Sequence, residues 1–183
     1  KEITKTETKY LPEVLDLFSK TATEICCGQQ FDMEFEQRLD VTIDEYIEMI
    51  RLKTAVLMGC ALKEGAIVAG AGKEDCDALY DFGINIGLAF QLMDDLLDVY
   101  GDPATFGKKI GGDILCNKKT FLFINAFQSD KKEELILWIN KENYNPDEKI
   151  KAVTEIYNNL GLKEISIKLI TEYYQKAMSY FDK

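Results

Sequence analysis

Residues 90–104, FQLMDDLLDVYGDPA, contain four aspartates, and three of them, Asp94, Asp95 and Asp98, lie in the strongly apolar part before Gly101. Asp94 and Asp98 are four residues apart, and Asp95 lies beside them. On a helix this spacing puts Asp94 and Asp98 on one face, with Cβ atoms about 5 to 6 Å apart. Unpaired carboxylates inside a protein are costly, so lysines or a hard divalent cation must neutralise them. The chain has no histidine, and oxygen ligands favour magnesium. Because magnesium is usually shared with substrate phosphates, the pattern predicts a phosphorylated ligand.

The same aspartates could instead face solvent, which is the usual location of an acidic pair. Their neighbours argue against a surface location, because most of the other residues of this segment are large and apolar. The large apolar neighbours are Leu88, just before the segment, and Phe90, Leu92, Met93, Leu96 and Leu97 within it. A helix so apolar all round belongs to the core, so we expect the aspartates in the interior.

Lysines could supply positive charge to a bound diphosphate. Lys53 lies on a largely apolar stretch, where its ammonium must either meet an anion or extend to solvent, the commoner outcome for a lone lysine. Lys108 and Lys109 lie among glycines, and Lys118 and Lys119 follow. Several ammonium groups could therefore close over phosphate oxygens.

The glycine-rich loop does not match the phosphate loop of ATP-binding proteins. Five residues rather than four separate Gly101 from Gly107, and Lys109 stands where a serine or threonine should follow the lysine. A kinase or an NTPase is therefore disfavoured.

The helix that must position the aspartates is predicted to begin near the acidic residues 74–77 and to run to about Tyr100. Steps of three and four residues from Asp94 trace a polar face with glycine gaps. This face consists of Tyr80, Gly83, Gly87, Gln91, Asp94 and Asp98. Gly83 and Gly87 are small enough to leave room, so we expect the face to line an internal cavity.

Periodic apolar residues predict further helices on both sides of this one. A helix over residues 10–27 should break or bend at Gly28, and one over 42–62 should start with the capping-box pair Thr42 and Glu45. Residues 65–72 should be a connector and residues 101–112 a loop. Later helices are predicted over residues 118–127, 131–140, 147–159 and 162–181, with Gly161 ending the third of these.

Composition limits the class of protein. With 183 residues, 46% of them hydrophobic, the chain should form one globular domain over residues 1–183. It has only three prolines and few turn clusters, so an all-α domain is favoured over a many-stranded sheet. A net charge of −10 disfavours binding to a nucleic-acid backbone.

The cysteines and the longest apolar run bear on where the protein acts. Five cysteines form no CxxC pair, so neither a disulfide framework nor a zinc site is indicated, and we expect a cytoplasmic location. The longest apolar run, residues 55–62, is far shorter than the roughly 20 residues that span a bilayer, so stable membrane insertion is not expected.

The ordered motifs resemble those of the trans-type isoprenyl diphosphate synthases, which include the farnesyl, geranylgeranyl and longer-chain polyprenyl synthases. Residues 90–120, FQLMDDLLDVYGDPATFGKKIGGDILCNKKT, resemble the second aspartate-rich motif and the lysine loop that follows it. GQQFD at residues 28–32 resembles the family's GQ-x-x-D segment, and Lys53 with Thr54 its lysine-threonine pair. The helix order from Gly28 onward is similar too, so the resemblance implies a bundle of mostly antiparallel helices around a central cavity.

The resemblance also implies roles for single residues. Asp94 would ligate Mg²⁺, and Asp95 and Asp98 would complete the motif directly or through metal-bound water. Residues that would contact the allylic diphosphate are Lys53, Thr54, Gln91 and Lys108. Asp113 would support Lys108 and the metal site. Gln29 and Asp32 match the GQ-x-x-D segment, and Lys118 matches the family's lysine after the loop. Lys109 and Lys119 have weaker claims.

The implied reaction ionises an allylic diphosphate, adds isopentenyl diphosphate to the carbocation and loses a proton, while pyrophosphate leaves. The catalytic residues would be Lys53, Gln91, Asp94 and Lys108. A homodimer is implied as well.

The family's first aspartate-rich motif and its two arginines are not found in this sequence. Asp77 and Asp81 have helical spacing but not the motif context, so we interpret them as charges near a helix start. We expect the chain to be the carboxyl-terminal part of a longer synthase, with the amino-terminal helices missing and little activity alone. The alternatives are a non-catalytic or regulatory subunit of a heteromeric synthase, or a helical interaction protein whose acids and lysines form structural salt bridges.

Overall fold

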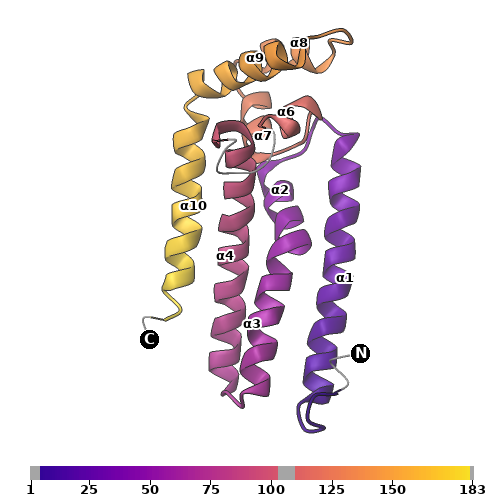
Figure 1. The fold of residues 1–183 in the computed structure, drawn as a ribbon, viewed down its shortest axis with the longest axis vertical. Helices are drawn as coiled ribbons and strands as arrows, with labels where there is room; N and C mark the ends of the chain where they lie inside the picture. The colour runs from indigo at the N-terminus through magenta and orange to yellow at the C-terminus, as the bar shows by residue number, and fades with distance from the viewer. Residues whose placement is uncertain (1–4, 103–109, 182–183) are drawn as a thin grey trace. The chain divides into compact units, whose positions relative to one another are not determined.

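A computed structural model describes residues 5–102 and 110–181, and this part of the chain is helical without any strand (Figure 1). The prediction of an all-α fold is confirmed. The helical segments are α1 (Leu11–Glu36), α2 (Ile43–Ile50), η2 (Arg51–Ala55), α3 (Val56–Val68), α4 (Lys73–Tyr100), α6 (Gly112–Leu115), α7 (Phe121–Phe127), α8 (Lys132–Ile139), α9 (Pro146–Asn159) and α10 (Leu162–Met178).

The sequence predicted a break or a bend at Gly28, but helix α1 continues through this residue to Glu36. A Cβ added at Gly28 would lie 2.4 Å from the backbone nitrogen of Lys53. Real Cβ atoms do not approach so closely, so the glycine lets two backbones pack together. The missing side chain therefore serves helix packing and not helix termination.

Helix α2 begins as predicted, with Thr42 and Glu45 forming a capping box. The backbone N–H of Thr42 donates to Oε2 of Glu45 at 2.8 Å, and the N–H of Glu45 donates to Oγ1 of Thr42 at 3.2 Å. The helical path then includes a π-helical turn, η2, and continues through α3 to Val68. The predicted connector over residues 65–72 is therefore shorter than expected, and the turn between α3 and α4 occupies residues 69–72.

Helix α4 has nearly the predicted bounds, but its glycines do not open a cavity. A Cβ added at Gly83 would lie 2.6 Å from Cα of Gly59, and one at Gly87 would lie 2.5 Å from Cα of Ala55. Gly59 belongs to α3 and Ala55 is the last residue of η2, and α3 runs beside this part of α4 in Figure 1. The glycines permit close approach of two helices, so the expectation that they leave room for a ligand was wrong.

The apolar residues of α4 are not uniformly buried either. Leu88, Leu92 and Leu96 are buried, whereas Phe90 is 54% exposed and Met93 is 38% exposed. The helix therefore has a core face and an open face, in contrast to the prediction of a helix buried all round.

The later helices start and stop with recognisable signals. Thr120 caps α7 by accepting a hydrogen bond from the N–H of Phe123, and Asn145 caps α9, whose first residue is Pro146. The segment predicted as one helix over residues 118–127 begins only after Lys118 and Lys119, at Phe121. Gly161 has φ +63° and separates α9 from α10, as expected for a helix-ending glycine.

The chain divides into two compact units. The first is drawn from Lys1–Met33, Ile47–Phe90 and Thr171–Lys183, and the second from Glu34–Tyr46 and Gln91–Ile170. In the first unit Val14 packs with Ala66, Ile67 and Cys76. The most deeply buried side chains of the second unit include Leu122, Ile124, Leu135, Ile156 and Tyr157. In the described part of the chain, no helix combines the length and the apolar character that crossing a membrane needs.

Candidate functional site

The second unit brings a lysine and two aspartates from the predicted site together. Nζ of Lys118 lies 3.3 Å from Oδ1 of Asp95 on α4 and 3.2 Å from Oδ2 of Asp113 on α6. The Lys118 side chain is 35% exposed, so its ammonium also has access to solvent. One cation between two carboxylates leaves a net negative charge, which a bound cation could offset.

Asp95 is the innermost member of this group, with 2% of its surface exposed. Its Oδ2 accepts a hydrogen bond from the Tyr46 hydroxyl at 2.5 Å, and its Oδ1 accepts one from Nε2 of Gln91 at 3.2 Å. With Lys118, three donors therefore surround this carboxylate. A buried carboxylate needs such partners, and side chains from three segments of the chain stabilise Asp95.

Burial and neighbouring charge shift the pKa values of the group. Burial raises the pKa of Asp95, despite the positive charge of Lys118 and the hydrogen bonds it accepts. Burial likewise raises the pKa of Asp113 to about 6, with the charges of Asp95 and Asp98 acting in the same direction and Lys118 against them. Burial alone would lower the pKa of Lys118, but the two carboxylates raise it above its ordinary value. Lys118 therefore stays protonated at neutral pH.

Asp98 holds the start of α6. Its Oδ2 accepts a hydrogen bond from the backbone N–H of Asp113 at 3.0 Å, and its carbonyl oxygen accepts one from the N–H of Gly111 at 2.6 Å. Gly111 has φ +83°, a backbone conformation that glycine adopts readily. Asp98 thus fixes the position of the helix that carries Asp113.

The acidic face of α4 fits a magnesium ion that is shared with a phosphate ligand. Asp94 and Asp98 lie on one face of the helix, and both are partly exposed. Within the described residues, no group of three or more acidic, cysteine or histidine side chains converges as an all-protein metal cage would require. Magnesium usually keeps several waters and takes one or two carboxylates together with substrate phosphates, which this arrangement allows.

The first unit holds the other predicted residues. Nζ of Lys53, on η2, lies 2.5 Å from Oδ2 of Asp32 on α1, and the two side chains are 36% and 22% exposed. Thr54 follows on the same π-helical turn and is partly exposed, and Gln29 on α1 is exposed. Lys53 thus has an acidic partner within its own unit, so it neither stands alone nor simply extends into solvent.

Three predicted lysines have other outcomes. Lys108 and Lys109 lie outside the described residues. Lys119 is buried, and its Nζ donates to the carbonyl oxygens of Glu36 at 3.3 Å and Asn117 at 3.0 Å. Its ammonium is therefore engaged with the backbone, in line with its weaker claim.

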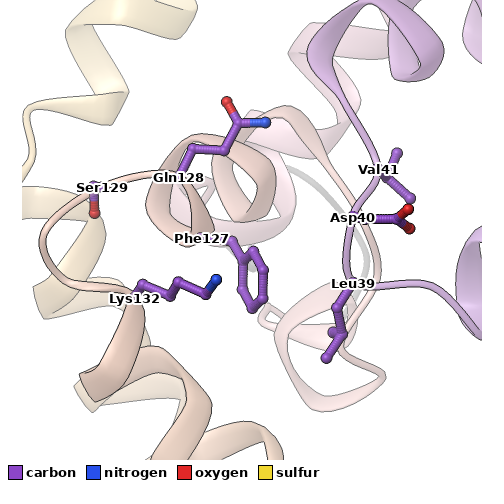
Figure 2. Close-up of a pocket in the computed structure, with 7 residues that line it drawn as sticks. All are labelled: Leu39, Asp40, Val41, Phe127, Gln128, Ser129 and Lys132. Carbon is purple, nitrogen blue, oxygen red and sulfur yellow. The ribbon is translucent and has the colours of Figure 1, made fainter.

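A surface hollow of about 540 Å³ lies elsewhere in the second unit. Its lining is Leu39, Asp40, Val41, Phe127, Gln128, Ser129 and Lys132. Figure 2 shows the Lys132 amino group directed toward the Phe127 ring, with 4.5 Å from Nζ to the ring centroid. None of the predicted site residues lines this hollow, so its volume gives no guide to the chemistry.

Sequence reasoning did not find the role of Tyr46. Tyr46 lies on the helix predicted over residues 42–62, and it is buried, with 1% exposed. Its hydroxyl nevertheless meets Asp95, which lies 49 residues away in the sequence. No local pattern predicts that contact, although a buried tyrosine usually needs a partner for its hydroxyl.

Solved structures with the same helical arrangement identify the fold. A crystal structure of a geranylgeranyl pyrophosphate synthase matches 98% of this chain with a TM-score of 0.93 and 44% identity, over 57% of its own chain. A polyprenyl synthetase from Streptomyces coelicolor A3(2) matches 96% of this chain with a TM-score of 0.87 and 27% identity, over 54% of its own chain. The fold is therefore that of the all-α isoprenoid synthases.

Sequence comparison gives the family. The family model described as polyprenyl synthetase matches residues 1–159. A short chain isoprenyl diphosphate synthase of Methanothermobacter thermautotrophicus is 38% identical over 174 residues, which are 93% of this chain and 53% of that protein. A geranylgeranyl diphosphate synthase of Methanosarcina mazei is 38% identical over 86% of this chain and 49% of its own length. The chain belongs to the polyprenyl synthetase family, and it spans about half the length of these relatives.

Proposed function

We propose that this chain is the carboxyl-terminal part of a prenyltransferase that condenses an allylic diphosphate with isopentenyl diphosphate and releases pyrophosphate. The observation that supports it best is the placement of Lys118 between Asp95 and Asp113, with Asp94 and Asp98 on the same helix as Asp95. Relatives named for geranylgeranyl and for geranylfarnesyl products both match, so the proposal concerns the reaction class and not a product length.

The arrangement suits the ionisation of an allylic diphosphate. Breaking the carbon–oxygen bond leaves additional negative charge on the departing diphosphate, so fixed positive charge stabilises the transition state more than the ground state. Lys118 supplies a permanent ammonium group, because the neighbouring carboxylates keep it protonated. A magnesium ion held by Asp94 and Asp98 would supply Lewis-acid stabilisation of the diphosphate oxygens.

We assign Asp95 a positioning role in place of the metal ligation that the motif had implied. Its carboxylate is buried and already accepts hydrogen bonds from Tyr46, Gln91 and Lys118. Metal ligation by this carboxylate would require that at least one of these partners move. Asp95 therefore orients Lys118 and leaves ligation to its partly exposed neighbours on α4.

Other parts of the proposal come from the family resemblance. Lys53, Thr54 and Lys108 would contact the allylic diphosphate, isopentenyl diphosphate would be the second substrate, and the protein would be a cytoplasmic homodimer. These statements stay predictions.

Isothermal titration of magnesium pyrophosphate into the chain tests the site. We expect binding that requires magnesium and disappears with excess chelator. Equal binding with and without magnesium would contradict the proposed metal site, and no binding at all would contradict the diphosphate site.

A second candidate function, a helical interaction protein, rests on the ion pairs of the candidate site. Lys53 with Asp32, and Lys118 with Asp95, could simply be structural salt bridges of a helical interaction protein. Replacing Asp94 distinguishes the two, because only the prenyltransferase proposal makes this carboxylate a magnesium ligand. A binding curve unchanged by Asp94→Asn would favour the interaction protein.

We also infer that the chain alone turns over slowly, because it lacks the family's first aspartate-rich motif. The measurement is product formation from an allylic diphosphate, isopentenyl diphosphate and magnesium. Turnover at rates usual for enzymes, about 1 s⁻¹ or more, would show that the second motif is sufficient. Such a result would also rule out a non-catalytic subunit.

A further inference from the structure

The turn that presents Lys118 has a defined geometry. Asn117 has φ +52° and is the one non-glycine residue with positive φ in the described part of the chain. The N–H of Asn117 donates to the carbonyl oxygen of Ile114 at 3.2 Å, and the N–H of Lys118 donates to that of Asp113 at 3.0 Å. These two bonds form a Schellman motif that ends α6, with Asn117 in the left-handed position. Lys118 is therefore the first residue beyond a fixed turn.

A buried lysine from α9 holds the side chain of Asn117. Nζ of Lys149 donates to Oδ1 of Asn117 at 2.8 Å and lies 4.6 Å from the centroid of the Tyr144 ring. Lys149 is only 2% exposed. Its described partners are an amide oxygen and an aromatic face and not a carboxylate, and burial lowers its pKa. Burying an ammonium without a carboxylate partner costs free energy of folding. We therefore expect Lys149 to have a role that an apolar side chain at this position could not fill.

The next residue of α9 holds the other end of α6. A Cβ added at Gly111, the residue before α6, would lie 2.7 Å from Cδ1 of Ile150. Gly111 also donates its N–H to Asp98, as described above. Lys149 and Ile150 thus contact the two ends of a four-residue helix, and that helix carries Asp113 and leads into Lys118.

We propose that Lys149 and Asn117 are positioning residues that hold Lys118 in place for a bound diphosphate. This role rests on the proposed function, because it assumes that Lys118 contacts the ligand. A side chain that must stabilise charge in one place gains from being fixed before the ligand arrives, since no ordering is then needed on binding. The contact between Lys149 and Asn117 holds the turn that carries Lys118, and it does so without involving Asp95 or Asp113.

Amide hydrogen exchange tests the positioning without any ligand. Lys149→Met keeps an unbranched side chain of nearly the same length but removes the ammonium, and Asn117→Gly keeps the backbone conformation accessible but removes the acceptor oxygen. We expect at least tenfold faster exchange of the Lys118 amide in both variants, with the amides inside α9 unchanged. Lys151→Met, an exposed position on the same helix, is the matched control and should leave exchange unchanged.

Binding and stability separate positioning from a purely structural role. Lys149→Met should raise the Kd for magnesium pyrophosphate about tenfold, or about 1.4 kcal/mol. The double variant with Asn117→Gly should be no worse than either single variant, because both remove the same contact. The midpoint of urea unfolding should stay equal or rise in Lys149→Met, since a methionine avoids the cost of a buried charge.

Two results would overturn the assignment. Unchanged exchange at the Lys118 amide in Lys149→Met would show that the contact does not hold the turn. A lowered unfolding midpoint with unchanged Kd would show that the contact is structural only. If the wild-type chain binds no magnesium pyrophosphate, the proposed function fails instead, and the purpose assigned to Lys149 and Asn117 fails with it.

Discussion

The hydroxyl of Tyr46 donates a hydrogen bond to Oδ2 of Asp95 at 2.5 Å, and both side chains are buried. The charge of Asp95 and burial together raise the pKa of Tyr46 well above its ordinary value, burial having the larger effect. The tyrosine is therefore a permanent donor to this carboxylate. Because Asp95 also accepts from Lys118, the contact connects α2 to the lysine of the candidate site.

Tyr46→Phe should lower the free energy of unfolding by about 1–3 kcal/mol, because one oxygen of a buried carboxylate loses its donor. Urea unfolding measures the change. The matched control is Tyr100→Phe, whose hydroxyl donates to Asn158 at 2.9 Å in an exposed position, and which should cost less than about 1 kcal/mol. Equal losses in the two variants would contradict a special role for the buried contact.

Asp94→Asn should weaken magnesium-dependent binding of pyrophosphate about 10–100-fold, a loss of about 1.4–2.7 kcal/mol. The neutral amide is a poorer ligand for a hard cation than a carboxylate. Titration calorimetry gives the Kd at fixed magnesium. Asp81→Asn, an exposed position on the same helix, should leave the Kd unchanged, and a similar loss there would point to the overall charge of α4 instead.

The pKa of Asp113 predicts a pH dependence of stability. Its folded-state pKa of about 6 lies above the ordinary aspartate value of about 3.9, so the folded chain binds more protons than the unfolded chain between these values. The stability that protonated Asp113 contributes is therefore complete below about pH 4 and lost as the pH rises through 6.

Urea unfolding without metal, at several values between pH 4 and 7, measures this effect. Wild type should lose stability relative to Asp113→Asn as the pH rises through that window, because asparagine does not ionise. A difference between the two chains that is constant with pH would show that Asp113 has an ordinary pKa.

The close packing of η2 and α3 on α4 predicts opposite effects for alanine at two glycines, one inside the contact and one outside it. Gly87→Ala should destabilise the chain by about 1–3 kcal/mol, because the new Cβ would meet the backbone of Ala55 at 2.5 Å. Gly65→Ala, on the same helix pair, has nothing within 4 Å and should stabilise by about 0.5–1 kcal/mol. Thermal or urea unfolding of both variants checks the signs. A tolerated alanine at 87 would contradict the packing.

Much of the fold follows from local sequence. Apolar residues at three- and four-residue spacings and the Thr42 and Glu45 capping box located the helix starts within a few residues, and the glycine at 161 located one helix end. These signals can be seen locally, because a helix is stabilised by contacts between residues close in sequence. Glycine was the residue most often misinterpreted, since Gly28, Gly83 and Gly87 serve contacts with other helices.

By itself, the sequence determined that the chain is helical, that an acidic face lies on the helix ending near Tyr100, and that the motifs resemble those of the prenyl synthases. Only the tertiary structure decided which carboxylate is buried and what each ammonium meets. The carboxylate of Asp95 accepts hydrogen bonds from Tyr46 and Lys118. The ammonium of Lys149 donates one to Asn117. Such contacts join residues dozens of positions apart. The energy of such a contact depends on the distance between the atoms and on their burial, and neither can be read from residue spacing along the chain.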